Sequence, residues 1–333
     1  MRPQNVAVVG ATGAVGHEML RVLAQRAFPL ASLRLIASPA SAGKKVTFDG
    51  AEHTLVAPSR EAFSGLDLAL FSAGASVARE WGPVAAGLGA LVVDNSSAFR
   101  QDPEIPLVVP EVNARALENN PRRIVANPNC STIQMVVALA PLHRAFGLEQ
   151  VVVSTYQAIS GKGARALDEF DAQARDLAAG REATHSVLPG VLAQNLLCDW
   201  KHDADGWSEE ERKMVFETRK ILGMPSLAVS PTTVRVPVRN AHSESVWARF
   251  AKPVTRAEAL EVLRGAEGVT VQSESGPGAH PQPRFASGKD DVFVGRVRED
   301  ASDKRALHLW VVSDNVRKGA ALNAVQIAER VLR

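Results

Sequence analysis

Residues 5–16 read Asn-Val-Ala-Val-Val-Gly-Ala-Thr-Gly-Ala-Val-Gly, an apolar run that leads directly into a glycine turn. The run over 5–9 is typical of a strand buried on both faces of a parallel sheet. Apolar residues then recur at helical spacing over 19–27, and 33–37 predict a second strand. Strand, glycine turn, helix and strand in this order open a βαβ unit.

The alternation of strand and helix continues towards residue 94. Apolar strands are expected at 67–72 and 90–94, around a helix over 76–87, and this pattern favours an open parallel sheet. The second half changes character, because its expected strands have faces of mixed polarity, as in an antiparallel or mixed sheet with one covered face. These strands are expected at 151–156, 232–238, 245–250 and 307–312, with a loop at 273–283 and a closing helix at 318–332.

The pattern therefore predicts an α/β protein with two domains. A Rossmann-type parallel-sheet domain is expected over 1–129 plus 314–333, and an α+β domain with a mixed sheet over 130–313. The 333 residues contain 38 Lys and Arg against 36 Asp and Glu, a net charge of +2. This balance gives no reason to expect nucleic acid or a membrane as partner. No signal peptide and no apolar run long enough to span a bilayer is visible, so we expect a cytoplasmic protein.

The glycine turn is a candidate phosphate-binding site. Gly10, Gly13 and Gly16 follow a variant spacing, G-x-x-G-x-x-G, in which backbone and helix N-terminus can approach a pyrophosphate. A plain strand-to-helix turn with packing glycines remains the alternative. No acidic residue follows the second strand, and 37–45 instead carry hydroxyls and two lysines. Such groups suit a 2′-phosphate, so NADP is favoured over NAD. The alternative is a surface loop whose hydroxyls and lysines only face water.

The chain has two cysteines, which excludes a disulfide scaffold and argues against a cysteine-rich metal site; no metal is predicted. Cys130 follows Pro128 and Asn129, two helix-start signals, and should lie in the first turn of an apolar helix. A helix N-terminus raises the thiolate fraction, so Cys130 is a candidate nucleophile, and a small buried apolar residue is the alternative. Cys198 lacks this context and is expected to be structural. His242 is a candidate base.

The combined motifs resemble one family, the aspartate-semialdehyde dehydrogenases, over almost the whole chain. They are GATGAVG at 10–16, NSSAFR at 95–100, NPNCST at 127–132, TYQAISGKG at 155–163, ERK at 211–213, RVPV…AHSE at 235–244 and SDN at 313–315. The resemblance implies a glyceraldehyde-3-phosphate-dehydrogenase-like fold, a homodimer, and NADPH-dependent reduction of L-aspartyl 4-phosphate to L-aspartate 4-semialdehyde with release of phosphate. That reaction belongs to lysine, diaminopimelate, threonine, methionine and isoleucine biosynthesis.

The resemblance also implies residue roles. Cys130 would be the nucleophile that forms a thioester, His242 the acid/base, and Gln157 a residue that orients the substrate. Arg235 would bind the substrate α-carboxylate, Glu210 its amino group, and Arg100 with Lys213 the phosphate. The substrate-binding set is Arg100, Asn129, Gln157, Glu210, Lys213 and Arg235. The cofactor-binding set is Gly10, Thr12, Gly13, Ala14, Val15, Ser38, Ala40, Ser41, Ser160, Gly161 and Asn315.

One position departs from the family. Members often carry arginine before the serine that matches Ser41, and this chain has Ala40 there. Lys44 or Lys45 would have to compensate, or NAD would be tolerated. Two other functions stay open on the sequence: an acyl-phosphate reductase similar to N-acetylglutamyl-phosphate reductase, and a catalytically silent dinucleotide-binding paralogue.

Overall fold

A computed structural model describes residues 1–272, 276 and 278–332 of the chain. The chain divides into two compact units, Met1–Asn129 with Ala320–Arg333, and Cys130–Gly319. The domain limits expected from the sequence differ from this division at residues 314–319. The reason is local, because Asp314 and Asn315 make hydrogen bonds to loops of the second unit.

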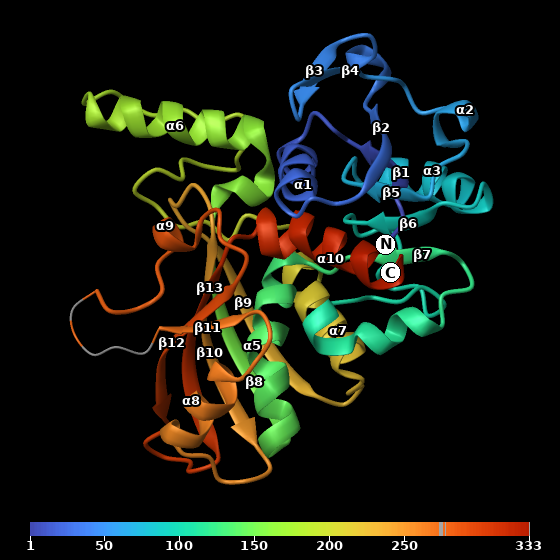
Figure 1. Cartoon of the computed structure of the whole chain (residues 1–333). Coiled ribbons are helices and arrows are strands. Elements are labelled where there is room, and N and C mark those ends of the chain that lie inside the picture. Colours follow the sequence, from blue (N-terminus) through green and yellow to red (C-terminus); the bar gives the residue numbers. More distant parts are fainter. Residues whose placement is uncertain (273–275, 277, 333) are drawn as a thin grey trace. The chain divides into compact units, whose positions relative to one another are not determined.

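The first unit is built on a parallel sheet with strand order β2-β1-β5-β6-β7 (Figure 1). Its strands are β1 (Gln4–Val9), β2 (Leu30–Ile36), β5 (Leu68–Phe71), β6 (Leu91–Asp94) and β7 (Ile124–Ala126). Its longer helices are α1 (Ala14–Gln25), α3 (Ala75–Gly87) and α10 (Leu322–Val331). α1 packs against α10, and α3 packs against β5, β6 and β7. The predicted parallel-sheet fold is confirmed.

Several elements of the first unit were not predicted from the sequence. They are the hairpin of β3 (Lys45–Phe48) and β4 (Ala51–Thr54), and the short helices η1 (Pro39–Ser41), α2 (Arg60–Phe63), α4 (Pro110–Asn113) and η2 (Ala114–Glu118). The closing helix also needs a correction at its start. Residues Arg317–Ala321 form a π-helical turn, η4, and the regular α-helix begins at Leu322 rather than at 318.

The glycine turn between β1 and α1 is tightly packed against its own backbone. Gly10 has φ +86°, a conformation that favours glycine. A Cβ on Gly16 would lie 2.3 Å from the Gly10 carbonyl oxygen and 2.9 Å from Ala11 Cα. Only glycine fits at position 16 without moving the turn. β1 lies between β2 and β5, so the turn sits where the strand order reverses, the usual ligand position in such sheets.

The Gly16→Ala variant is therefore expected to lose about 1–3 kcal/mol of unfolding free energy, as overpacked sites do. Urea unfolding measures the loss. Gly13→Ala is the matched control, because its Cβ would lie 3.4 Å from the Gly10 oxygen and its φ is −82°. The control should stay within about 0.5 kcal/mol of the parent. Equal stability of the two variants would contradict the packing argument.

The second unit has a mixed sheet with strand order β11-β12-β13-β10-β8-β9, as predicted in kind. Its strands are β8 (Leu148–Gln157), β9 (Ala228–Arg235), β10 (His242–Phe250), β11 (Val269–Gln272), β12 (Val292–Glu299) and β13 (Ala306–Ser313). The β8–β9 and β11–β12 pairs are parallel and the remaining pairs are antiparallel. Helix α5 (Cys130–Phe146) packs on β8, β10, β12 and β13 and is buried from Ser131 to Leu142 (Figure 1).

The other helices of this unit were not predicted. They are η3 (Ile159–Lys162), α6 (Ala164–Ala178), α7 (Glu209–Leu222), α8 (Arg256–Arg264) and α9 (Pro283–Ala286). The strand expected over 232–238 ends at Arg235, two residues before Pro237, which has no N–H to give to a sheet. Of the loop expected at 273–283, residues 273–275 and 277 lie outside the described residues, and Pro283 starts α9.

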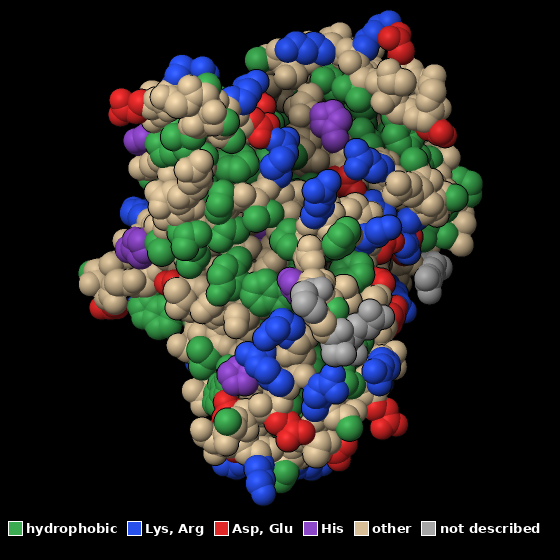
Figure 2. All heavy atoms as spheres, turned by 90° about the vertical axis from the view of Figure 1, so that its left-hand side faces the viewer, with side chains coloured by type: hydrophobic (Ala, Val, Ile, Leu, Met, Phe, Trp, Pro, Cys, Tyr) green, Lys and Arg blue, Asp and Glu red, His purple; other side chains and the backbone are tan. Residues whose placement is uncertain are grey.

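One face of β8 remains partly open. Val152 and Tyr156 alternate with buried residues on this strand and keep 39% and 37% of their surface exposed. The Tyr156 ring packs on Trp310 of β13 at 5.3 Å between centroids. Hydrophobic side chains reach the molecular surface in patches (Figure 2). Among the described residues, no helix is both long and apolar enough to cross a membrane.

Candidate active site

The second unit brings the predicted nucleophile and acid/base together. Cys130 is the first residue of α5, and its Sγ lies 3.3 Å from Nε2 of His242 at the start of β10. As a whole residue, Cys130 is partly exposed. The helix N-terminus places backbone N–H groups and a positive dipole end beside the sulfur, where they stabilise an anion. A Cβ on Gly319 would lie 2.7 Å from Cys130 Cβ, so a larger residue at position 319 would collide with the cysteine side chain.

His242 is fully buried, and each of its ring nitrogens has a neighbour. Nδ1 accepts a hydrogen bond from the Ala158 backbone N–H at 2.9 Å, while Nε2 faces Cys130. Burial lowers the pKa of His242 well below its usual 6.5, and the nearby Arg235 charge lowers it further. The imidazole is therefore neutral at physiological pH.

Gln157 and Glu210 form a second pair of predicted residues. Gln157 ends β8, is 1% exposed, and its Nε2 donates to Glu210 Oε1 at 3.4 Å. Lys213, one turn further along α7, lies 3.6 Å from Glu210 Oε2 and 3.0 Å from Glu209 Oε1. Helix α7 starts with a capping box in which Ser208 and Glu211 satisfy each other's backbone N–H groups. The cap fixes the turn that carries Glu210.

Arg235 is held by residues that the sequence did not indicate. Its Nε lies 3.3 Å from Oδ2 of Asp199, and its Nη1 donates to the Ala158 carbonyl at 2.8 Å. The Trp200 ring lies over the guanidinium, with Cζ 4.6 Å from the centroid. Lys162 also binds the fully buried Asp199 side chain, at 3.1 Å. We name Asp199, Trp200 and Lys162 the arginine cradle.

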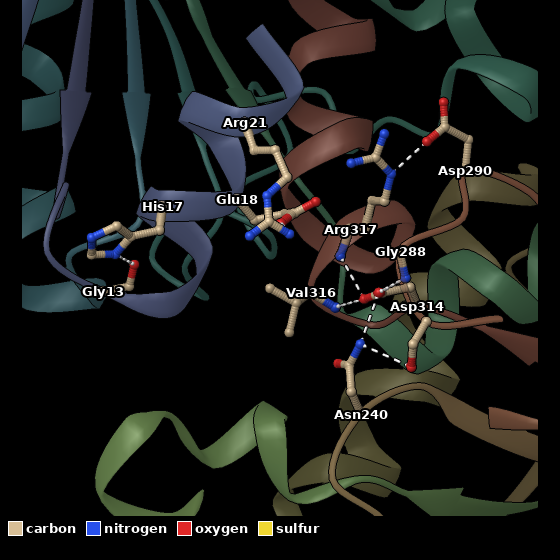
Figure 3. Close-up of polar contacts among 11 residues, drawn as sticks. Gly13, His17, Glu18, Arg21, Asn240, Gly288, Asp290, Asp314, Val316 and Arg317 are labelled. Atoms are coloured by element: carbon tan, nitrogen blue, oxygen red, sulfur yellow. Dashed lines mark hydrogen bonds and ion pairs between the residues drawn. The ribbon is translucent and has the colours of Figure 1, made fainter. Parts of the chain in front are cut away.

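The predicted residues Ser160 and Asn315 bind each other, with their side chains 2.9 Å apart, and Asn315 also accepts from the Ala241 N–H. Asp314 accepts hydrogen bonds from the N–H groups of Gly288, Val316 and Arg317 and from the Asn240 side chain (Figure 3). Gly161 lies against the site, because a Cβ there would be 3.4 Å from Arg235 Nη1 and 3.6 Å from the His242 ring.

The first unit carries the other predicted residues. Thr12, Gly13, Ala14 and Val15 form the turn and the start of α1, which has no side-chain cap and no acidic residue in its first turn. A cavity of about 350 Å³ opens beside this turn, lined by Gly10, Ser38 and Trp81 among others. Ala40 and Ser41 lie in η1, next to Ser38. Arg100 donates to the Asn95 carbonyl at 3.0 Å, and Arg100 and Asn129 are each 8% exposed.

A further carboxyl group lies two residues beyond His242 on the same strand. Glu244 on β10 is 0% exposed and pairs with Thr155 of β8 in the sheet register. Burial raises the pKa of Glu244 well above its usual 4.5, and a contact with Gln134 of α5 offsets only part of that rise. No cation pairs with it among the residues the structure describes. The Glu244 carboxyl therefore keeps its proton to a higher pH than an exposed glutamate does.

The raised pKa of Glu244 predicts a pH effect on stability. Above pH 4.5 the unfolded chain releases this proton while the folded protein keeps it, so the stability contribution falls as pH rises towards the folded-state pKa. Glu244→Gln cannot titrate, and it should become more stable than the parent by up to about 1.4 kcal/mol per pH unit in that window. Urea unfolding at several pH values measures this gap. Glu182→Gln, at an exposed position, is the control; a gap that does not change with pH would contradict the prediction.

Two further sequence expectations bear on the site. Cys198 was expected to be structural, but it is exposed, whereas its neighbour Leu197 forms a bridge with Arg235. No cluster of metal-ligating side chains is found in the described part of the chain.

Two family descriptions match the chain. "Semialdehyde dehydrogenase, NAD binding domain" matches residues 5–120, and "Semialdehyde dehydrogenase, dimerisation domain" matches residues 139–318. The parallel sheet with its glycine turn and the mixed sheet with its cysteine–histidine pair thus define a semialdehyde dehydrogenase. The chain belongs, more narrowly, to the aspartate-semialdehyde dehydrogenase family.

Individual relatives support the narrower assignment. The aspartate-semialdehyde dehydrogenase of Aquifex aeolicus is 48% identical, with 98% of each chain covered. The structure of aspartate semialdehyde dehydrogenase II from Vibrio cholerae, complexed with ASA, is 44% identical with a TM-score of 0.97, covering 100% of this chain and 99% of that one. The Candida albicans enzyme, solved with NADP, is 25% identical with a TM-score of 0.77 and covers 99% of this chain and 98% of that one.

Proposed function

We propose that this protein catalyses the NADPH-dependent reduction of L-aspartyl 4-phosphate to L-aspartate 4-semialdehyde and phosphate. The contact of Cys130 Sγ with His242 Nε2 at the start of α5 is the observation that carries the proposal. Cys130 attacks the acyl carbon, phosphate leaves with the electrons of the carbon–oxygen bond, and a thioester links substrate and enzyme. Covalent catalysis divides one difficult displacement into two easier steps. Backbone N–H groups at the start of α5 stabilise negative charge that develops on the acyl oxygen.

The remaining predicted residues bind the amino acid and the phosphate. Arg235 binds the α-carboxylate through two parallel N–H groups, a geometry that a lysine ammonium does not offer. Nε is directed at Asp199 and one Nη1 hydrogen at the Ala158 carbonyl, so the second Nη1 hydrogen and the Nη2 hydrogens are left for this task. Glu210 binds the α-amino group and Gln157 orients the acyl group. Lys213 and Arg100 bind the phosphate, and Asn129 lies beside the nucleophile in the chain.

The residues of the first unit fit a dinucleotide. The uncapped N-terminus of α1 offers backbone N–H groups to a pyrophosphate, and the cavity beside Gly10 and Ser38 has room for one end of the ligand. Bound NADPH supplies the hydride. Ser38, Ser41 and Lys44, which follow β2 in the chain, are the residues proposed to bind the 2′-phosphate, whereas Lys45 is paired with Glu52 at 2.7 Å. Ser160, Gly161 and Asn315 complete the proposed contacts, and no acidic residue follows β2 to favour NAD.

The assembly proposed is a homodimer. The match to a dimerisation domain and the exposed side chains of Val152 and Tyr156 on β8 support it. A cytoplasmic location and the absence of nucleic-acid or membrane partners form part of the same proposal, and the near-neutral charge of the chain supports them.

The test is the reverse reaction, followed by NADPH absorbance with the purified protein. Aspartate semialdehyde, NADP⁺ and phosphate should all be required, and arsenate-free buffer without phosphate should give no turnover. N-acetylglutamate semialdehyde in place of aspartate semialdehyde tests the other acyl-phosphate reductase. Turnover with that substrate alone, or no turnover with either, would overturn the proposal. The ratio of kcat/KM for NADP⁺ and NAD⁺ tests the cofactor, and equal values would remove the NADP assignment.

A further inference from the structure

The residue before β10 has a backbone conformation that alanine rarely adopts. Ala241 has φ +71°, in the left-handed region where a Cβ comes too close to the following carbonyl oxygen and glycine is usual. The residue is 0% exposed and belongs to an apolar cluster with Ala286 and Val312, so its methyl group has a packing role. A residue with a Cβ stays left-handed only where its surroundings determine the conformation, and such residues gather at functional sites. Ala241 must therefore be held by contacts that outweigh its preference.

The chain on both sides of this alanine is fixed by backbone hydrogen bonds. The carbonyls of Val238 and Arg239 accept from N–H groups of η3, at 2.8 and 3.0 Å. On the other side, β10 begins directly after Ala241 and pairs with β8 and β13. Only Asn240 and Ala241 lie between the two fixed segments, so the conformation of these two residues decides where β10 begins.

A chain of side-chain hydrogen bonds links these two residues. Asn240 Nδ2 donates to Asp314 Oδ2 at 2.8 Å (Figure 3), and the Ser160 hydroxyl donates to Asn240 Oδ1 at 2.9 Å. Asn315 Nδ2 donates to Ser160 Oγ at 2.9 Å, and Asn315 Oδ1 accepts from the Ala241 N–H at 3.0 Å. We name Asp314, Asn240, Ser160 and Asn315 the amide network. It starts at Asn240 and returns to the backbone of the next residue.

The two ends of the amide network fix the direction of its hydrogen bonds. The Asp314 carboxylate can only accept, so it faces the NH₂ group of Asn240, whose oxygen is left for Ser160. The Ala241 N–H can only donate, so it faces the Asn315 oxygen, and the Asn315 NH₂ group is left for Ser160. The Ser160 hydroxyl lies 2.9 and 3.0 Å from the two amide oxygens, and only the Asn315 oxygen already has the Ala241 N–H. Neither amide can turn over without losing a bond.

We propose that the amide network holds Ala241 in the left-handed conformation, and that Asp314 and Asn240 are thereby positioning residues for the proposed reaction. The methyl group of Ala241 supplies apolar packing, and the network offsets its conformational preference. The same bonds fix the side chains of Ser160 and Asn315, two of the proposed cofactor contacts. One set of hydrogen bonds thus sets both the start of β10 and two side chains of the cofactor site. The catalytic part of this inference rests on the proposed function.

Three variants test whether the network acts through the backbone of Ala241. Asn240→Ala removes the bonds to Asp314 and Ser160 and should free the turn. Asn240→Ala with Ala241→Gly supplies a residue that adopts the left-handed conformation without the network. Asn240→Ala with Ala27→Gly is the matched control. Ala27 is also a left-handed alanine, with φ +47°, and lies exposed after α1 in the other unit, so glycine there relieves a similar strain elsewhere.

Asn240→Ala is expected to lower kcat about tenfold and to raise Kd for NADP⁺ about threefold, because small misplacements at a site are costly. Adding Ala241→Gly should return kcat to within about threefold of the parent, whereas adding Ala27→Gly should restore nothing. Steady-state kinetics and titration calorimetry measure these values. Equal recovery with both glycine substitutions would indicate a general loss of stability, and no recovery with either would remove the backbone of Ala241 from the explanation. Each result would overturn the proposal.

Hydrogen–deuterium exchange gives a readout that needs no substrate. The Ala241 N–H, bonded to a buried oxygen, should exchange at least about tenfold faster in Asn240→Ala than in the parent, as read from overlapping peptides. Unchanged exchange would overturn the proposal even if kcat fell. A parent protein without turnover would disprove the proposed function instead, and the exchange rates and NADP⁺ affinities would still show whether the network holds the turn.

Discussion

Cys130→Ala is expected to lower kcat on the order of 10⁴-fold or more, because no other group can form the thioester. Cys130 is the one cysteine at the start of a long helix in contact with a histidine. The reverse assay with aspartate semialdehyde, NADP⁺ and phosphate measures the loss. Binding of aspartate semialdehyde and phosphate should be affected much less, because the thiol takes part in bond formation, whereas other residues bind the carboxylate and the phosphate.

The control for Cys130 is the other cysteine of the chain. Cys198→Ala removes an exposed thiol and should leave kcat within about twofold and stability within about 0.5 kcal/mol. Thermal unfolding of both variants tests whether a folding defect causes the lost activity. Removing the sulfur at position 130 should cost little unfolding free energy, so we expect helix α5 to stay intact. Activity of Cys130→Ala within tenfold of the parent would remove the nucleophile assignment.

Local patterns were sufficient to predict the parallel sheet and the position of Cys130. The strand over 5–9 and the later one over 90–94 are buried on both faces, and such strands read as unbroken apolar runs. The glycine turn could be recognised because its neighbours were a strand and an amphipathic helix. Pro128 and Asn129 indicated a helix start, and α5 begins at the next residue.

Helix α7 shows a signal that was present and missed. Most residues of this helix are charged, so the helical spacing of its few apolar residues was a weak signal. Ser208 with Glu211 is a capping box, and Gly223 ends the helix in the left-handed conformation, so both ends could have been predicted from residue types. The position of Glu210 in the first turn would have followed.

The arginine cradle could not be predicted, because it depends on pairing between distant segments. Leu197 exchanges backbone hydrogen bonds with Arg235, at 2.7 and 3.1 Å, and this bridge brings Asp199 and Trp200 to the guanidinium. Nothing in the composition of 197–200 indicates that partner. The hydrogen bond to His242 Nδ1 is equally invisible in the sequence, because it comes from the backbone N–H of Ala158, one residue beyond β8, rather than from a side chain.

Arg235→Lys is expected to lower kcat/KM for aspartate semialdehyde about 10²–10³-fold, mostly through KM. Lysine keeps the charge but loses the paired N–H groups, the Nε contact with Asp199 and the stacking on Trp200. The KM values for phosphate and NADP⁺ should change little, because neither ligand is bound by this side chain. Steady-state kinetics with each of the three ligands varied in turn measures the difference.

A milder substitution in the arginine cradle should weaken binding of the same substrate to a smaller extent. Asp199→Asn keeps a hydrogen-bond acceptor near Nε but removes the charge that Arg235 and Lys162 share. Like Arg235→Lys, this variant should raise KM for aspartate semialdehyde and leave the KM values for phosphate and NADP⁺ almost unchanged. The rise should be smaller, about tenfold. A guanidinium held on one edge by Asp199 and on one face by Trp200 loses little conformational freedom when the carboxylate arrives, which is the physical advantage of the arrangement. Equal rises in all three KM values for either variant would instead indicate a general defect in the fold, and would separate Arg235 from carboxylate recognition.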